Sequence, residues 1–175
     1  MAEAAATIQA VTLRRARPAD NARIAAIWNH EVMWTTATMD TEPRGPAAQR
    51  RWLAAHDDAH PVVVAVDDVL AYGSLSPYRD RPAFTSTVAD SVYVRADRRG
   101  AGLGSSVVAE LLRLARALGH HTVIASISAD QAASLALHQA FGFVEKGRLA
   151  ELGHKLGRWV DVLYLQRMEI GRAHV

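Results

Sequence analysis

The sequence of 175 residues contains no cysteine. This absence excludes disulfides, thiolate metal sites and a cysteine nucleophile. No apolar run approaches the roughly 20 residues that a membrane-spanning helix needs. Residues 1–10 also lack the basic start and the apolar core of a secretory signal. We therefore expect a cytoplasmic protein that does not associate with membranes.

The sequence also lacks a large excess of charge of either sign. The formal net charge is +2, and the arginines are spread along the chain among acidic residues. Such a distribution lacks the basic patch that nucleic-acid binding requires, so we expect no nucleic-acid partner. The eight histidines follow no metal-ligand spacing, and we predict no metal site.

The composition that remains is typical of one globular domain, with half of the residues apolar and 22% charged. We expect residues 1–10 to be a disordered tail and residues 11–170 to form a single domain. Periodicity predicts strands over 11–15, 62–66, 69–76, 85–95, 122–127, 143–148 and 159–168, and helices over 20–34, 47–56, 102–119 and 131–141. Asp20 is predicted to cap the first helix, and residues 153–157 to form a loop. This order favours an α/β fold with three α/β/α layers and a mixed central sheet.

A glycine-rich turn follows the strand over 85–95 and leads at once into the third helix. Its sequence is Arg98-Arg99-Gly100-Ala101-Gly102-Leu103-Gly104-Ser105. Glycines let the backbone approach a ligand closely, and the free N–H groups of a helix start bind anions. The spacing is neither the dinucleotide fingerprint nor a P-loop. It does match the acyl-CoA signature R/Q-x-x-G-x-G/A, and on this motif the chain resembles the GNAT acetyltransferase superfamily.

Within that superfamily the chain is similar to the phosphinothricin (methionine sulfoximine) acetyltransferases over roughly residues 13–167. Several motifs carry this resemblance in the same order along both sequences. They include Trp28-Asn29-His30, Thr35-Thr36-Ala37, Ser91-Val92-Tyr93-Val94, Leu137-His138, Phe141-Gly142-Phe143 and Lys155-Leu156-Gly157-Arg158-Trp159. The resemblance implies a central sheet whose two middle strands splay apart to admit acetyl-CoA.

The resemblance also implies which residues hold the cofactor. The backbone of Val92, Tyr93 and Val94 pairs with the pantetheine arm, and the turn from Arg98 to Ser105 holds the pyrophosphate. Ser134 matches a pantetheine contact. Gln131 stands where the family has asparagine, and His138 where many superfamily members have tyrosine. The alternatives are a solvated charge for Arg98, helix-start capping for Gln131 and Ser134, and a packed helix histidine for His138.

Acetyl transfer to an amine needs a base for the ammonium and an acid for the leaving thiolate. The resemblance implies His138 as that acid. The usual base of the family is a glutamate, but this position holds Ala89. Asp90 is the neighbouring candidate, although strand alternation points it to the opposite face unless a bulge re-aims it. A relay through Tyr93 or His138, or transfer without a base, is the alternative.

The acceptor side departs from the family as well, because an expected arginine is Thr85. Arg79 and Arg81 are candidate ligands for an acceptor carboxylate, or surface arginines. Trp34 and Thr36 are expected beside the acceptor, although Trp34 could simply pack.

The sequence therefore predicts an acetyl-CoA-dependent N-acetyltransferase that acts on a small amino-acid-like amine and, as in the family, forms a homodimer. Two alternatives remain open. One is an N-acetyltransferase of another amine or of a peptide N-terminus, and the other is an acyl-CoA-binding module without catalysis.

Overall fold

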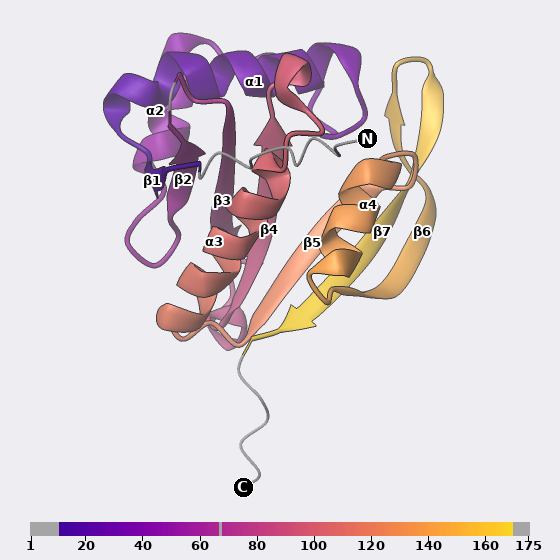
Figure 1. Ribbon diagram of the computed structural model, residues 1–175. Helices are drawn as coiled ribbons and strands as arrows, with labels where there is room; N and C mark the ends of the chain where they lie inside the picture. Colours follow the sequence, from indigo (N-terminus) through magenta and orange to yellow (C-terminus); the bar gives the residue numbers. More distant parts are fainter. Residues whose placement is uncertain (1–10, 67, 170–175) are drawn as a thin grey trace, which may run out of the picture.

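The structure is a computed structural model that describes residues 11–66 and 68–169 (Figure 1). The predicted tail over residues 1–10 lies outside the described residues, and a single domain over 11–170 stays a prediction. The regular elements are β1 (Leu13–Arg15), α1 (Asn21–Trp34), α2 (Pro46–Ala54), β2 (Val62–Ala65), β3 (Ala71–Pro77), β4 (Thr87–Val94), α3 (Leu103–Ala117), β5 (Thr122–Ser128), α4 (Ala132–Ala140), β6 (Val144–Lys155) and β7 (Arg158–Met168). Short 3-10 helices are η1 (Pro18–Asp20), η2 (Pro82–Phe84) and η3 (Ala96–Arg98).

One sheet of seven strands runs through the molecule in the order β1-β2-β3-β4-β5-β7-β6. All neighbouring pairs are antiparallel except β4 and β5, which are parallel. Helices α3 and α4 cover one face of the sheet, and α1 and α2 the other (Figure 1). The predicted three-layer α/β fold with a mixed sheet is confirmed.

Helix α3 forms the centre of the larger core because its apolar residues recur at helical spacing. Val107, Val108, Leu111 and Ala115 are buried against the sheet. Helix α3 packs closely against β3 at Gly73, where an added Cβ atom would lie 2.5 Å from the side chain of Val107 and 2.8 Å from that of Leu111. Only a residue without a side chain fits there.

Two local predictions were wrong. The predicted loop over 153–157 is mostly strand, because β6 continues to Lys155 across an irregularity between Leu149 and Gly153. A turn with positive φ at Leu156 (52°) and Gly157 (75°) then reverses the chain, and two such residues give the tight hairpin turn that matches strand twist. Asp20 occupies the predicted N-cap position of α1, but its side chain makes no capping hydrogen bond to that helix. Its carboxylate instead accepts hydrogen bonds from the Arg17 backbone and the Arg14 guanidinium, at 2.7 Å each.

Among the described helices, none is both long enough and apolar enough to cross a bilayer.

The tight contact at Gly73 yields a stability prediction. We expect Gly73→Ala to lower the free energy of unfolding by about 1–3 kcal/mol, the usual cost of overpacking a core. Urea unfolding measures this difference. Gly147→Ala, in open space on β6, is the matched control and should change stability by less than about 1 kcal/mol. An unchanged midpoint for Gly73→Ala would contradict the packing argument.

Candidate active site

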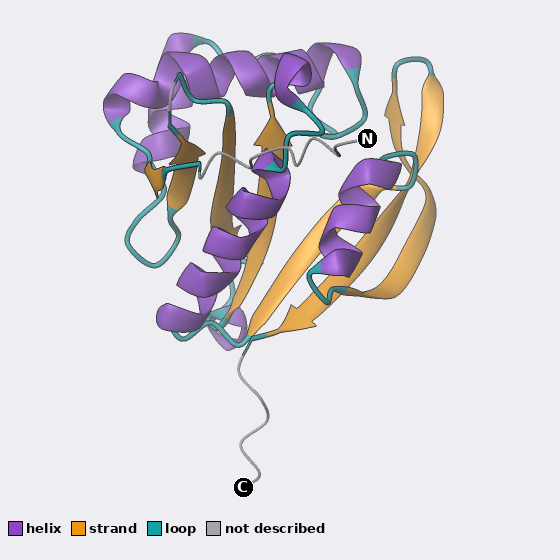
Figure 2. Cartoon of the chain, in the orientation of Figure 1, coloured by secondary structure: helices purple, strands orange, loops and turns teal. Residues whose placement is uncertain are grey.

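The candidate site lies where β4 and β5 separate. These strands pair only from Thr87 to Ala89 on β4 and from Thr122 to Ile124 on β5, and they diverge beyond (Figure 2). The cleft that opens between them is lined by Ala37, Asp90, Ser91, Val92, Tyr93, Ala125, Ser126, Ile127, Ser128, Gln131, Ser134 and His138. The structure therefore brings together the predicted residues of β4 and of α4.

The diverging strands offer free backbone groups to a ligand. Residues 90–94 of β4 pair with β3 on one edge, and residues 125–128 of β5 pair with β7. The edges that face each other across the cleft have no strand partner among the described residues. An extended chain that carries amides, such as pantetheine, fits between them by adding hydrogen bonds to an open edge.

The glycine turn lies at the end of β4 and starts α3. Gly100 and Gly102 have φ of 78° and 79°, and a Cβ atom at either would meet nothing within 4 Å. The turn is therefore open, and its positive φ values favour glycine. The N–H groups of Leu103, Gly104 and Ser105 form the first turn of α3, where they have no acceptor within the helix. Such a helix start suits a pyrophosphate.

Two arginines border this turn. Arg98 is exposed, with Asp97 3.7 Å away. Arg99 pairs with Glu31, a carboxylate that is only 3% exposed near the end of α1. The second pair links the turn to the helix on the other face of the sheet.

His138 and Asp90 form a buried pair beside the cleft. The Nε2 atom of His138 is 3.1 Å from Oδ2 of Asp90, and Nδ1 donates to the Ser134 carbonyl at 2.8 Å. Burial opposes a charged imidazole, but the Asp90 carboxylate outweighs this effect and raises the pKa of His138 above its ordinary value. The two side chains can therefore share one proton. Asp90 lies on the α3/α4 face, as alternation predicted, and its Oδ1 atom has no partner among the described residues.

Tyr93 faces the opposite side of the sheet. Its ring packs against Trp28, at a centroid distance of 5.2 Å, and against Tyr72, at 5.3 Å. Burial raises the pKa of Tyr93 above its ordinary value, so its hydroxyl keeps its proton near neutral pH. Tyr93 can donate a hydrogen bond there, but it is a poor base.

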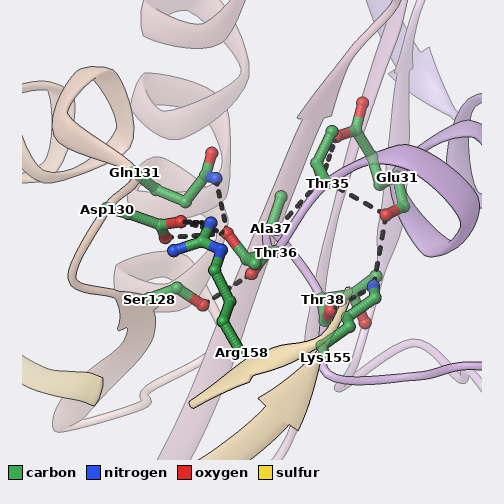
Figure 3. A network of polar contacts seen from close by, with 10 residues as sticks. All are labelled: Glu31, Thr35, Thr36, Ala37, Thr38, Ser128, Asp130, Gln131, Lys155 and Arg158. Atoms are coloured by element: carbon green, nitrogen blue, oxygen red, sulfur yellow. Dashed lines mark hydrogen bonds and ion pairs between the residues drawn. The ribbon is translucent and has the colours of Figure 1, made fainter. Parts of the chain in front are cut away.

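The loop after α1 is fastened to the far wall of the cleft (Figure 3). The Thr36 hydroxyl donates to the Asp130 carboxylate at 2.7 Å and accepts from the Gln131 amide at 2.9 Å. The Ser128 hydroxyl donates to the Thr36 carbonyl at 2.5 Å, and Arg158 pairs with Asp130. Thr36 is 1% exposed, so it positions the loop, and Ala37 rather than Thr36 lines the cleft.

Two buried charges complete this network: Glu31, which sequence reasoning missed, and Lys155, which it quoted in a motif without a role. The Glu31 carboxylate accepts from the Thr35 hydroxyl at 2.8 Å, and Lys155 Nζ donates to the carbonyls of Thr38 (2.6 Å) and Glu31 (3.3 Å) (Figure 3). Burial lowers the pKa of Lys155, although Asp40 and Glu31 oppose the shift. One signal was available for Glu31, which continues the apolar stripe of Ile24, Ile27 and Trp28 on α1.

The other acceptor candidates lie away from the cleft lining. Arg79 and Arg81 are exposed in the loop that joins β3 to the start of β4, and Arg79 stacks on Tyr78 at 5.3 Å. Trp34 is 71% exposed at the end of α1.

Comparisons with known proteins agree with this geometry. Residues 24–143 match the model of the acetyltransferase (GNAT) family. The chain is 39% identical over 159 residues to an L-methionine sulfoximine/L-methionine sulfone acetyltransferase from Pseudomonas paraeruginosa, covering 89% of this chain and 92% of that protein. It is 38% identical to the L-amino acid N-acyltransferase MnaT from Escherichia coli, with the same coverage of each chain.

A solved structure is similar as well. It is a GNAT superfamily phosphinothricin acetyltransferase from Sinorhizobium meliloti in complex with acetyl-CoA. The TM-score is 0.86 with 34% identity, covering 91% of this chain and 89% of that one. The fold and the cleft thus define an acetyltransferase that uses acetyl-CoA. The chain belongs to the GNAT acetyltransferase family.

The buried pair allows a direct test. We expect Asp90→Asn to lower the pKa of His138, because the amide removes the negative charge that favours the imidazolium. An NMR titration of the His138 ring measures this change. Asp97→Asn, which lies in η3 and faces Arg95, is the control and should leave the titration unaltered. An unchanged pKa of His138 in Asp90→Asn would contradict the pairing.

Proposed function

We propose that this acetyltransferase acetylates the primary amine of a small amino-acid-like molecule, of the phosphinothricin or methionine sulfoximine type, by direct attack in a ternary complex. The observation that carries the proposal is the cleft between β4 and β5, with the open glycine turn at one end and the His138–Asp90 pair in its wall. The acceptor class follows relatives named for methionine sulfoximine and L-amino acids.

The residues that would hold acetyl-CoA fall into three groups. The first-turn N–H groups of α3, with Arg98 and Arg99 nearby, bind the pyrophosphate. The free edge of β4 at Val92–Val94 pairs with the pantetheine arm, and Gln131 and Ser134 flank it from α4. When bound, acetyl-CoA supplies an activated acetyl group as a thioester.

His138 acts as the acid in this mechanism. Asp90 raises the pKa of His138 against the effect of burial, which favours the imidazolium, and this group gives its proton to the leaving thiolate. Asp90 keeps that proton in place. Asp90 as the general base stays a prediction, and its contact with His138 favours the role of partner to the acid.

The acceptor residues and the homodimer are proposed together. Trp34, Leu152, Leu156 and Trp159 are each at least half exposed, on the β6–β7 hairpin and at the end of α1. Met39, in the loop after α1, touches Gly153 of the hairpin, so these segments adjoin. A second subunit on this surface would cover the apolar side chains. The second subunit would also bring its loop between β3 and β4 near the cleft. Arg79 and Arg81 of that loop would bind the acceptor carboxylate. The cytoplasmic location stays part of this proposal.

The proposed reaction is tested by thiol release from acetyl-CoA against a panel of amines. We expect turnover with phosphinothricin, methionine sulfoximine and methionine sulfone, and little with polyamines or short peptides. Turnover confined to the polyamines or peptides would overturn the acceptor class, and binding of acetyl-CoA without any turnover would favour a non-catalytic role.

The cofactor turn is tested by calorimetry. We expect Gly102→Asp to weaken acetyl-CoA binding at least about tenfold, because it adds strain at positive φ and a negative charge beside the pyrophosphate. Gly147→Asp, in open space on β6, is the control and should bind normally. Normal binding by Gly102→Asp would mean that the pyrophosphate lies elsewhere.

The homodimer is tested by sedimentation velocity. We expect a species of twice the 19.0 kDa chain mass, and we expect Trp159→Glu to shift it to the monomer, since a charge at a buried interface is costly. Leu118→Glu, at the exposed end of α3, should remain dimeric. A wild-type monomer at assay concentrations would contradict the proposal.

A further inference from the structure

The inference below rests on the proposed function. In that reaction the ammonium group of the acceptor cannot attack the thioester until it loses a proton. The glycine turn and α4 place the cofactor on the α3/α4 face of the sheet. The acceptor must then reach the thioester from the α1/α2 face, where the β4–β5 pairing ends. A base for the acceptor should lie on that face, and it should be uncharged near neutral pH.

Most ionisable groups on the α1/α2 face do not meet this requirement. Glu31 is engaged by Arg99 and by the Thr35 hydroxyl. Lys155 donates to two backbone carbonyls. Burial raises the pKa of both Tyr72 and Tyr93, which keeps their hydroxyls protonated.

His56, just after α2, has the required lone pair. Its Nδ1 atom is 2.8 Å from the Trp52 carbonyl. A carbonyl has no proton to give, so Nδ1 carries the hydrogen and Nε2 is free to accept. Nε2 is 3.2 Å from the Ser76 hydroxyl, which therefore donates to it. The ring also packs against Trp52 in a tilted arrangement, at a centroid distance of 4.5 Å.

Ser76 lies on β3, one strand away from the cleft, at the level where β4 and β5 separate. It pairs with Ala89 in the β3–β4 ladder, and Ala89 is the last residue of β4 that pairs with β5. Directly opposite residues share a face, with Cβ atoms about 4.5–5.5 Å apart. The small side chain of Ala89 therefore leaves the Ser76 hydroxyl beside the point where the strands separate.

The charges around His56 keep it neutral. Burial lowers the pKa of His56, and the Trp52 carbonyl opposes this shift in part. His60 and Arg44 lower the pKa further, whereas Asp57 raises it. His56 thus holds no second proton near neutral pH and can accept one.

We propose that His56, acting through the Ser76 hydroxyl, takes the proton from the ammonium group of the acceptor. One N–H bond of the acceptor breaks and its proton passes to Ser76 Oγ, while the Ser76 proton passes to His56 Nε2. The nitrogen keeps the electron pair and forms the bond to the acetyl carbon. As the C–S bond breaks, the nitrogen loses a second proton, which replaces the one that His138 gives up. His138 protonates the thiolate, and the half-buried His56 returns its proton to solvent.

The test is the pH profile of kcat/KM for the best amino-acid-like acceptor, from about pH 6 to about pH 9. We expect Ser76→Ala and His56→Asn to lose about 10²-fold near pH 7, the lower end of what a general base contributes. Both should approach the wild-type rate at alkaline pH, where the neutral amine is already present. His121→Asn, at a half-buried histidine just before β5, is the control and should keep the wild-type profile.

A second substitution separates chemistry from folding. Ala89→Glu places a carboxylate beside Ser76, and in His56→Asn it should restore activity near neutral pH. Acetyl-CoA affinity by calorimetry should be unchanged in all of these variants. A loss that is the same at every pH, or no loss at all, would overturn the relay. A wild-type enzyme without turnover on any amino-acid-like acceptor would overturn the proposed function, and the relay with it.

Discussion

The three-residue pairing between β4 and β5 is the constraint on which the site depends. Beyond the paired end, each of these strands is paired to its other neighbour, so neither can bend back to close the gap. The core around α3 holds them at the paired end. Every residue in the cleft wall takes its position from this divergence, including two that are 48 residues apart, Asp90 and His138.

The sheet separates the proton chemistry into two faces. His138 lies on the α3/α4 face with a raised pKa, and His56 lies on the α1/α2 face with a lowered one. Burial lowers both pKa values, and the shifts have opposite sign because the Asp90 carboxylate outweighs burial at His138, whereas the Trp52 carbonyl opposes it only in part at His56. Two histidines of the same intrinsic chemistry thus suit the roles of acid and base.

Features set by neighbouring residues could be predicted from the sequence. The order of strands and helices and the glycine turn depend on local periodicity and on backbone conformation, and both are confirmed. The extension of β6 over residues 149–155 could not be predicted, because Gly153 and its neighbours form a strand only by pairing with β7. The partners of Asp20 were missed for a related reason, since an aspartate before a helix has several donors in reach.

The sequence named residues of β4 and α4 that line the cleft, but it did not predict the network of contacts around them. The contacts of Glu31, Lys155 and Asp130 form only when the fold brings together α1, the β6–β7 hairpin and the start of α4. The same holds for His56, whose partner Ser76 lies 20 residues away on β3.

The fastening of the loop after α1 has an evolutionary consequence. Thr36 and Ser128 hold this loop through a hydroxyl and a backbone carbonyl, so its path does not depend on the side chains at positions 34 and 37. Those positions can therefore exchange one residue for another without loss of the scaffold. A chain built in this way keeps the path of the loop while the residues that the loop presents vary.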